Sequence, residues 1–271
     1  MDLAWVRSHR DAGGRAGLAL APGEVLLAGG TWLFSEPQPD VTGLVDLTTL
    51  GWEPWETLPG GGLRLGATCS IQQAQQAPWP SSAGTLARQC ADALLMSGKV
   101  QSAATVGGNV CLGLPAGAMI SLTAGLAGDV VVWTPDGGER REPVAAFVRG
   151  AGTVHLRPGE VLRAIELPGA ALRAPTASRR TALTTHGRSS ALVTGRREPA
   201  AVVLTVTASV PRPVVLTLPP GMPGPDVQRA VARAGTAVGW YDDPHGAPDW
   251  RAAQTGLLAA EVHAELAGAT A

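Results

Sequence analysis

Two short glycine-rich segments carry the residue types that could do chemistry in this sequence. The first reads LLAGGTWL over residues 26–33, and the second reads AATVGGNV over residues 103–110. Each is predicted to be a short apolar strand that runs into a Gly-Gly pair followed by a small polar residue. Glycines let a diphosphate approach the backbone, whose exposed N–H groups form an anion-binding nest. Thr31, Thr105 and Asn109 can add hydroxyl and amide contacts.

A tight turn is the other explanation of a Gly-Gly pair, because glycine adopts positive φ without steric cost. Two such loops could instead close on the two phosphates of a dinucleotide from opposite sides. The residues alone leave both interpretations open. The sequence contains no G-x-G-x-x-G, no G-x-x-x-x-G-K-[ST] and no G-x-S-x-G, so the common nucleotide and hydrolase motifs give no support to other assignments.

Composition excludes several classes of function. The 271 residues carry a formal net charge of −1, which offers no electrostatic basis for binding nucleic acid or an anionic membrane. Cys69, Cys90 and Cys111 form no CxxC pair, and the five histidines show no HxxxH spacing. We therefore expect buried, reduced cysteines, no metal site, and no catalytic acid–base or nucleophilic group.

No targeting or membrane segment is predicted. The first twenty residues lack an uninterrupted apolar stretch, which argues against a signal peptide. The most apolar segment, residues 116–133, is interrupted by Ser121, Thr123, Asp129 and three glycines, so it does not have the pattern of a membrane span. The sequence thus indicates a cytoplasmic protein.

Short strands and helices alternate in the first part of the chain and would position the glycine loops. Strands are predicted over 24–30, 44–50 and 159–168, and a strand–turn–strand unit over 129–144. Residues 62–76 begin as a strand and become helical, with Thr68 or Ser70 as the N-cap. A helix over 84–98 is expected to end at Gly98, and 118–128 is expected to be a buried helix.

The pattern changes near residue 170. Residues 168–180 are a connector rich in Pro, Ala and Arg, followed by segments typical of antiparallel strands within 181–220. Helices are expected over 224–238 and 249–268. The whole indicates an α+β protein with two domains, residues 1–170 and residues 171–271.

Four segments in order resemble a known family. AGGTWL (28–33) resembles the first FAD-pyrophosphate loop in the medium, flavin-binding subunits of molybdenum hydroxylases of the xanthine dehydrogenase and carbon monoxide dehydrogenase type, and ATVGGNVC (104–111) is similar to their second loop. FVRGAGTVHLRPGEVLRAIELP (147–168) resembles the segment that ends the flavin domain. DPHGAPDWRAAQTGLLAAEVHAEL (243–266) resembles the family's C-terminal helix. The agreement in order and spacing covers nearly the whole chain.

The resemblance implies a fold and a set of cofactor-binding residues. The fold would be an FAD-binding domain of two α/β subdomains, of the vanillyl-alcohol oxidase and PCMH-like type, followed by a domain with a three-stranded antiparallel sheet and helices. Arg179, or alternatively Arg180, would correspond to a basic residue near the isoalloxazine. The other residues implied to bind FAD are Leu27, Ala28, Gly29, Gly30, Thr31, Trp32, Leu33, Thr105, Val106, Gly107, Gly108, Asn109, Leu156 and Leu162.

The sequence departs from the family pattern at one polar position. Many relatives have an aspartate after the second loop that contacts the sugar or adenine side of the cofactor. Here LGLPAGAMI (112–120) has Gly117 or Ala118 at that place. The first loop also has Trp32 where a small residue or histidine is common.

The resemblance implies an electron-transfer function. Substrate would be oxidised at a molybdopterin centre on a large partner, and electrons would pass through [2Fe–2S] clusters on a small partner to FAD and then to an external acceptor. The assembly would be a dimer of heterotrimers, and the isolated chain would have little or no activity. Two alternatives stay open: a flavin-free scaffold of the same fold, and a self-sufficient FAD oxidoreductase. The second is disfavoured because residues after 170 are few and poor in acid–base groups.

Overall fold

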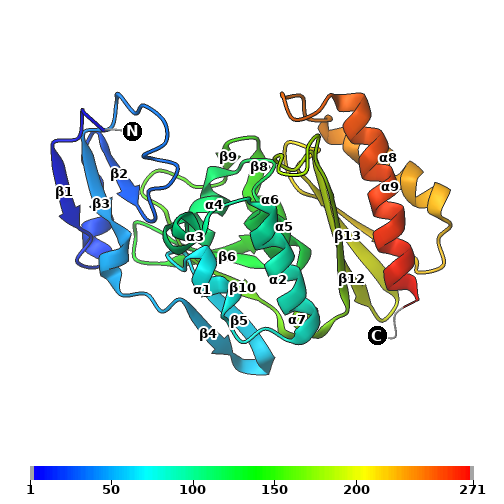
Figure 1. The fold of residues 1–271 in the computed structure, drawn as a ribbon. Helices are drawn as coiled ribbons and strands as arrows, with labels where there is room; N and C mark the ends of the chain where they lie inside the picture. The colour runs from blue at the N-terminus through cyan, green and yellow to red at the C-terminus, as the bar shows by residue number, and fades with distance from the viewer. Residues whose placement is uncertain (1–2, 269–271) are drawn as a thin grey trace.

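The computed structural model describes residues 3–268, so residues 1–2 and 269–271 of the two predicted domains lie outside the described part of the chain. Three layers follow one another in sequence and in space (Figure 1). A small N-terminal sheet lies beside a central sheet covered by helices, and a C-terminal sheet with two long helices packs on the far side. The predicted α+β class is confirmed.

The N-terminal layer is a three-stranded parallel sheet. Its order is β1 (Ser8–Asp11), β3 (Gly43–Asp46) and β2 (Glu24–Leu27). The strand predicted over 44–50 ends at Asp46 and is followed by a short 3-10 helix, Leu47–Leu50. Asp46 is the N-cap of this helix, because its carboxylate accepts a hydrogen bond of 2.8 Å from the Thr48 N–H. The first glycine loop therefore leaves the carboxyl end of β2, next to the central strand of this sheet.

The central layer is a five-stranded antiparallel sheet. It has the order β4 (Trp55–Leu58), β5 (Gly62–Gly66), β10 (Val161–Leu167), β6 (Asp129–Trp133) and β7 (Glu139–Pro143). The predicted strand–turn–strand unit over 129–144 and the strand over 159–168 are confirmed. Leu65, Val130, Val132 and Ile165 are fully buried and form part of the main core under the helices.

Five helices lie on one side of the central sheet, and all of them except α3 contribute buried residues to the main core. They are α1 (Ile71–Gln75), α2 (Ser81–Ala93), α3 (Gly98–Ala103), α4 (Val106–Leu112) and α5 (Ala118–Gly125). Ser70 rather than Thr68 is the N-cap of α1, because its hydroxyl accepts from the Gln73 N–H while the Gln73 side chain accepts from the Ser70 N–H. All residues of α5 are buried, as expected for 118–128.

Two predictions about the glycines here are wrong. The helix predicted to end at Gly98 ends at Ala93, and Gly98 instead begins α3, with Ser97 as its N-cap. The second Gly-Gly pair does not follow a strand: Gly107 and Gly108 lie in the first turn of α4, whose N-cap is Thr105. In both places a Ser or Thr hydroxyl satisfies a free N–H of the first turn, which starts a new helix.

The C-terminal layer is a four-stranded antiparallel sheet, not the three-stranded sheet that the resemblance implied. Its order is β11 (Thr176–Thr181), β12 (Ala191–Glu198), β13 (Ala201–Thr207) and β14 (Val214–Leu218). The additional strand β11 comes from the predicted connector over 168–180 and pairs with β12 from end to end. Its first residue is also fixed to α2, because the Thr176 N–H donates to the Ser82 hydroxyl over 2.7 Å.

The two predicted C-terminal helices are confirmed. They are α8 (Gly224–Val238) and α9 (Pro248–Ala267), and their apolar residues share a core with β12 and β13. The remaining short elements are the 3-10 helices Arg15–Leu18 and Pro59–Gly61, α6 (Val144–Phe147), β8 (Val148–Gly150), β9 (Thr153–Val154) and α7 (Gly169–Arg173). None of the helices within residues 3–268 has the length and apolar character that a membrane span needs.

A cation–aromatic stack joins the N-terminal and central layers. The Trp52 and Trp133 rings meet edge to face with their centroids 5.3 Å apart. The Arg163 guanidinium carbon lies 4.6 Å from the Trp52 ring centroid and 5.8 Å from the Trp133 ring centroid, and that of Arg15 lies 4.6 Å from the Trp133 centroid. Burial lowers the pKa of Arg163, so contact with the rings compensates part of its lost hydration.

We expect Trp52→Ala to lower the free energy of unfolding by about 2–4 kcal/mol, because it removes a large packed ring and one face of the Arg163 stack. Trp5, whose exposed fraction is 42%, provides the control, and Trp5→Ala is expected to change stability by less than about 0.5 kcal/mol. Chemical denaturation followed by circular dichroism measures both. Equal stability of the two variants would contradict a role for the stack.

Candidate functional site

The structure brings the two glycine segments together around one cavity. The cavity has a volume of about 280 Å³ and is lined by residues 25–33 together with side chains and backbone of α4 and the segment before it. A Cβ placed on Gly29 would lie 1.8 Å from the carbonyl oxygen of Ala103. Only glycine permits this close approach, which places the first loop directly against the start of the second segment.

The first loop presents a row of free backbone donors. Gly30 has φ of +67°, and the chain turns there so that the Phe34 N–H donates to the Gly30 carbonyl over 2.8 Å. Within residues 3–268, no protein acceptor is hydrogen-bonded to the N–H groups of Gly29, Gly30, Thr31, Trp32 or Leu33. A turn with positive φ and successive free N–H groups is the geometry of an anion-binding nest.

The second segment differs from the predicted second nest, because its N–H groups are already bound. Val106 donates to the Cys69 carbonyl over 2.8 Å, and Gly107 donates to the Ala67 carbonyl over 3.0 Å. Gly108 donates to the Thr105 hydroxyl over 3.0 Å. A Cβ on Gly107 would lie 2.5–2.7 Å from atoms of Ala67, so this glycine is required for the approach of α4 to the end of β5.

Four residues of the second segment line the cavity, namely Ala104, Thr105, Gly108 and Asn109. A Cβ on Gly108 would meet one atom within 4 Å, the Thr105 hydroxyl at 2.8 Å, and would otherwise enter open space. The Asn109 side-chain oxygen accepts a hydrogen bond of 3.1 Å from the Met119 N–H. That bond orients the amide, so its NH₂ group is the end available to a ligand.

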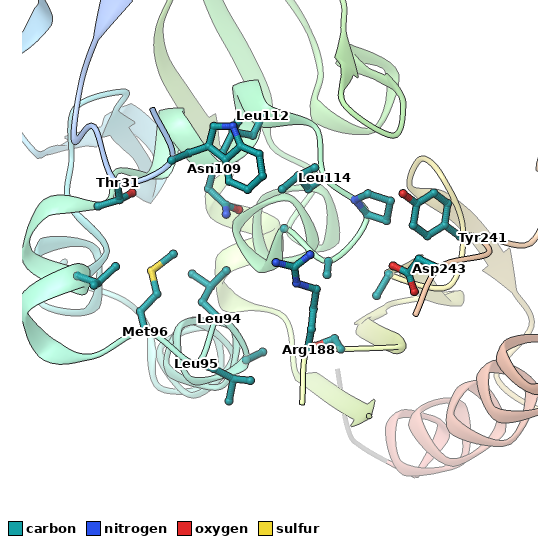
Figure 2. A pocket seen from close by; sticks show the side chains of 18 residues that line it. Thr31, Leu94, Leu95, Met96, Asn109, Leu112, Leu114, Arg188, Tyr241 and Asp243 are labelled. Atoms are coloured by element: carbon teal, nitrogen blue, oxygen red, sulfur yellow. The ribbon is translucent and has the colours of Figure 1, made fainter. Parts of the chain in front are cut away.

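A second cavity of about 410 Å³ adjoins the first and reaches the C-terminal layer (Figure 2). Thr31, Trp32 and Asn109 line both cavities. On the opposite side, the second cavity is bounded by the turn between α2 and α3 and by residues of the C-terminal layer, namely Arg188, Ser189, Ala208, Tyr241 and Asp243. A ligand with one end at the first loop could therefore extend to the C-terminal layer.

Sequence reasoning did not identify the far wall of this second cavity. Two of its residues, Leu95 and Ala208, have φ of 56° and 66°, in the left-handed region that non-glycine residues rarely occupy. Such backbone strain is often found at ligand sites. Arg188 lies in a segment with only a strand pattern, and Asp243 begins the segment that resembles the family's C-terminal helix, where no role is expected for its carboxylate.

Five of the residues implied to bind FAD line neither cavity, and one of them is Gly107, which is buried in the first turn of α4. Val106 and Leu162 are buried in the main core, and Leu156 packs against that core. Arg179 forms ion pairs of 3.2 and 2.7 Å with two glutamates of α9, and its alternative Arg180 donates to the Ser189 hydroxyl over 2.7 Å. The basic side chain that points into the larger cavity is Arg188 (Figure 2).

The place of the missing aspartate is closed by packing. A Cβ on Gly117 would lie 2.9–3.1 Å from Ile120, Leu114 and Asn109 atoms, and Ala118 is fully buried. A side chain at Gly117 would therefore require these neighbouring atoms to shift. Asp243, on the opposite wall of the larger cavity, is the carboxylate that lines it.

Within the described residues, no group of His, Cys, Asp and Glu side chains could hold a metal ion. Cys69 and Cys90 are buried, as expected, and burial raises the pKa of each thiol to about 12. Cys111 is partly exposed and lines the smaller cavity, so the expectation of burial holds for two of the three thiols.

The sequence model of one family, the FAD binding domain in molybdopterin dehydrogenase, matches residues 14–170, which is more than half of the chain. The chain belongs to this family. The match includes both glycine segments and all of the residues that line the smaller cavity. The larger cavity is completed by residues beyond the matched region, so the family's sequence pattern describes only part of its wall.

Solved structures share the fold over the whole chain. Quinoline 2-oxidoreductase from Pseudomonas putida 86 superposes with a TM-score of 0.82 at 19% identity, covering 98% of each chain. A carbon monoxide dehydrogenase from Hydrogenophaga pseudoflava that lacks the Mo-pyranopterin moiety gives 0.82 at 21% identity over 97% of each chain. Reconstituted CO dehydrogenase from Oligotropha carboxidovorans gives 0.82 at 19% identity over 100% of each chain. No curated protein sequence matches the chain.

The residues present fit the FAD of this family. Free N–H groups of Gly29–Leu33 suit the diphosphate, and the position of Gly108 leaves space that a side chain would occupy. The adjoining cavity has apolar walls with an amide from Asn109 and a guanidinium from Arg188, which suits a flat ring system with polar edges.

The two neighbouring glycines of α4 should respond differently to substitution in flavin-free protein. We expect Gly107→Ala to lower the free energy of unfolding by about 2–3 kcal/mol, because the methyl group overlaps backbone atoms of Ala67. Gly108→Ala should stay within about 1 kcal/mol of the wild type, since better helix propensity offsets the disturbed Thr105 cap. Denaturant titration measures both, and similar losses would show that Gly108 is also a packing glycine.

Proposed function

We propose that this chain is the FAD-binding electron-transfer subunit of a multi-subunit, molybdopterin-dependent hydroxylase or dehydrogenase. Electrons would reach its flavin from [2Fe–2S] clusters and leave to an external acceptor. The observation that carries the proposal is the row of N–H groups without a protein acceptor from Gly29 to Leu33, in residues that line one cavity together with Gly108 and Asn109, in a chain of this family.

In this proposal each group of residues has a separate task. The N–H groups of the first loop bind the diphosphate, and Gly29 holds that loop against Ala103. The Asn109 amide, oriented by Met119, donates to a polar edge of the ligand. Bound FAD supplies the redox chemistry. Apolar residues of the α2–α3 turn exclude water from the larger cavity, and Arg188 supplies one positive charge there.

Partners are required because the chain cannot supply the other redox centres. Three dispersed cysteines, two of them buried, cannot ligate an iron–sulfur cluster. We therefore propose that the chain associates with a small [2Fe–2S] partner and a large molybdopterin partner, and that the complex is a dimer of heterotrimers in the cytoplasm. We also propose that this chain divides into two domains near residue 170. Exposed Trp32, Leu95 and Val100 at the larger cavity offer an apolar surface that association would cover.

A flavin-free scaffold is the second candidate, favoured by one observation. The position where relatives carry a cofactor-binding aspartate is closed around Gly117. A self-sufficient flavoenzyme is less well supported, because no acid–base pair lines either cavity: Asp243 is the one carboxylate among the described lining residues, and no lining histidine accompanies it.

We expect purified full-length protein to bind one FAD per chain and to release FAD, not FMN, on heating. Gly108→Val should fold but lose the flavin, because the side chain occupies the space next to the first loop. Gly221→Val, at a surface glycine with open space around it, is the control and should retain the flavin. Absorption spectra and chromatography of the released cofactor measure both effects. A colourless wild type that cannot be reconstituted would favour the scaffold.

Co-expression with a molybdopterin subunit and a two-cluster subunit should give a stable complex. The isolated chain should show no substrate-dependent dye reduction with purines, aldehydes or carbon monoxide, because it holds neither the molybdenum centre nor the clusters. Size-exclusion chromatography and dye-reduction assays test the two expectations. Turnover by the chain alone at about 1 per second or more would overturn the partner-dependent function.

A further inference from the structure

Arg251 is a fully buried charged side chain with an unusual number of partners. It lies in the first turn of α9, and its exposed fraction is 1%. Its guanidinium donates to the carbonyls of Gly246 over 2.8 Å, Ser190 over 2.8 Å and Ala208 over 2.6 Å. It also pairs with the Asp243 carboxylate. One side chain thus connects three segments of the C-terminal layer.

Every segment that Arg251 holds also forms part of the larger cavity's far wall. Asp243 and Ala208 line the cavity themselves, and Ser190 follows the lining residue Ser189. The Tyr241 ring, a further lining residue, lies with its centroid 5.6 Å from the guanidinium carbon. Arg251 is not a lining residue, so the guanidinium stands behind this wall and contacts its backbone from the protein side.

The Ala208 contact also connects the wall to the central layer. Ala208 has φ of 66°, and its N–H donates over 2.8 Å to the carbonyl of Pro115, in the loop after α4. Its own carbonyl is bound by Arg251. The strained residue is therefore held from both sides, and the hydrogen bond from Arg251 provides part of the free energy that keeps it in the left-handed conformation.

The chemistry of the side chain explains why arginine is needed here. A planar guanidinium has five N–H donors in a fixed fork and can bind several carbonyls and a carboxylate at once. Lysine has three donors on a flexible stem and cannot reproduce these directions. Asp243 balances the buried charge, and its Oδ1 also accepts from the His245 N–H over 2.8 Å.

We propose that Arg251 is a positioning residue for the cofactor: with Asp243 it sets the far wall of the larger cavity and so determines how tightly the FAD end bound there is held and shielded. This inference rests on the proposed binding of FAD. The inference gives a role to Arg251, the arginine of the C-terminal segment DPHGAPDWR. Arg251 does not line the cavity and acts on it through the lining residues that it orients.

The test compares Arg251→Lys with Arg196→Lys in the full-length chain. Arg196 is a matched control because it is also buried in the C-terminal layer and binds the Gly125 carbonyl over 2.8 Å, but it lines neither cavity. We expect Arg251→Lys to weaken FAD binding about tenfold or more and to change the absorption bands and fluorescence of the bound flavin. Arg196→Lys should keep FAD affinity within about twofold and leave the flavin spectrum unchanged. Its melting temperature should fall by about as much as that of Arg251→Lys.

If Arg251→Lys does not fold, Asp243→Asn decides the matter, because it removes the charge partner and keeps the shape. A flavin affinity lowered about threefold or more, with an altered spectrum and a melting temperature near the wild type, supports the positioning role. Unchanged FAD affinity and an unchanged flavin spectrum in either variant would overturn the positioning role. The role would also be overturned if Asp243→Asn lost the flavin while Arg251→Lys kept the same FAD affinity and spectrum as Arg196→Lys. Wild-type protein that binds no FAD would instead refute the proposed function.

Discussion

The close backbone contact between Gly29 and Ala103 is the constraint on which the site depends. It places the first loop against the junction of α3 and α4, where any side chain at position 29 would overlap a carbonyl oxygen. The turn at Gly30 then leaves five successive N–H groups without a protein acceptor. Successive N–H groups without a protein acceptor at a cavity have the arrangement of an anion-binding nest.

The two glycine segments contribute in different ways. The first supplies donors, whereas the second supplies position, because the N–H groups of Val106 and Gly107 are bound to the carbonyls of Cys69 and Ala67. These bonds fix α4 to the end of β5, and only Gly108 leaves space toward the cavity. The same Gly-Gly pattern therefore serves as a nest in one place and as a helix start with close packing in the other.

Arginine connects the three layers. The chain has one lysine, Lys99, and uses guanidinium groups where layers meet. Arg163 stacks with Trp52 and Trp133 between the N-terminal and central layers, and Arg196 of β12 binds the carbonyl of Gly125 in α5. Arg251 joins the segments of the C-terminal layer that face the cavity. A planar group with five donors can bind carbonyls and stack on rings, which lysine cannot do equally well.

The sequence by itself determined the local elements and the first loop. Apolar periodicity predicts most strands and both C-terminal helices, and the LLAGGTWL segment reads as a strand followed by a loop, which agrees with the end of β2 at Leu27. Tertiary structure decided which N–H groups stay free, since the acceptors for Val106 and Gly107 lie between β5 and α1, far from the second segment in the sequence. It also made β11 a strand through pairing with β12, and it brought Arg188, Ala208 and Asp243 to the cavity. Hydrogen-bond partners and cavity walls come from residues distant in the sequence, and no local pattern records them.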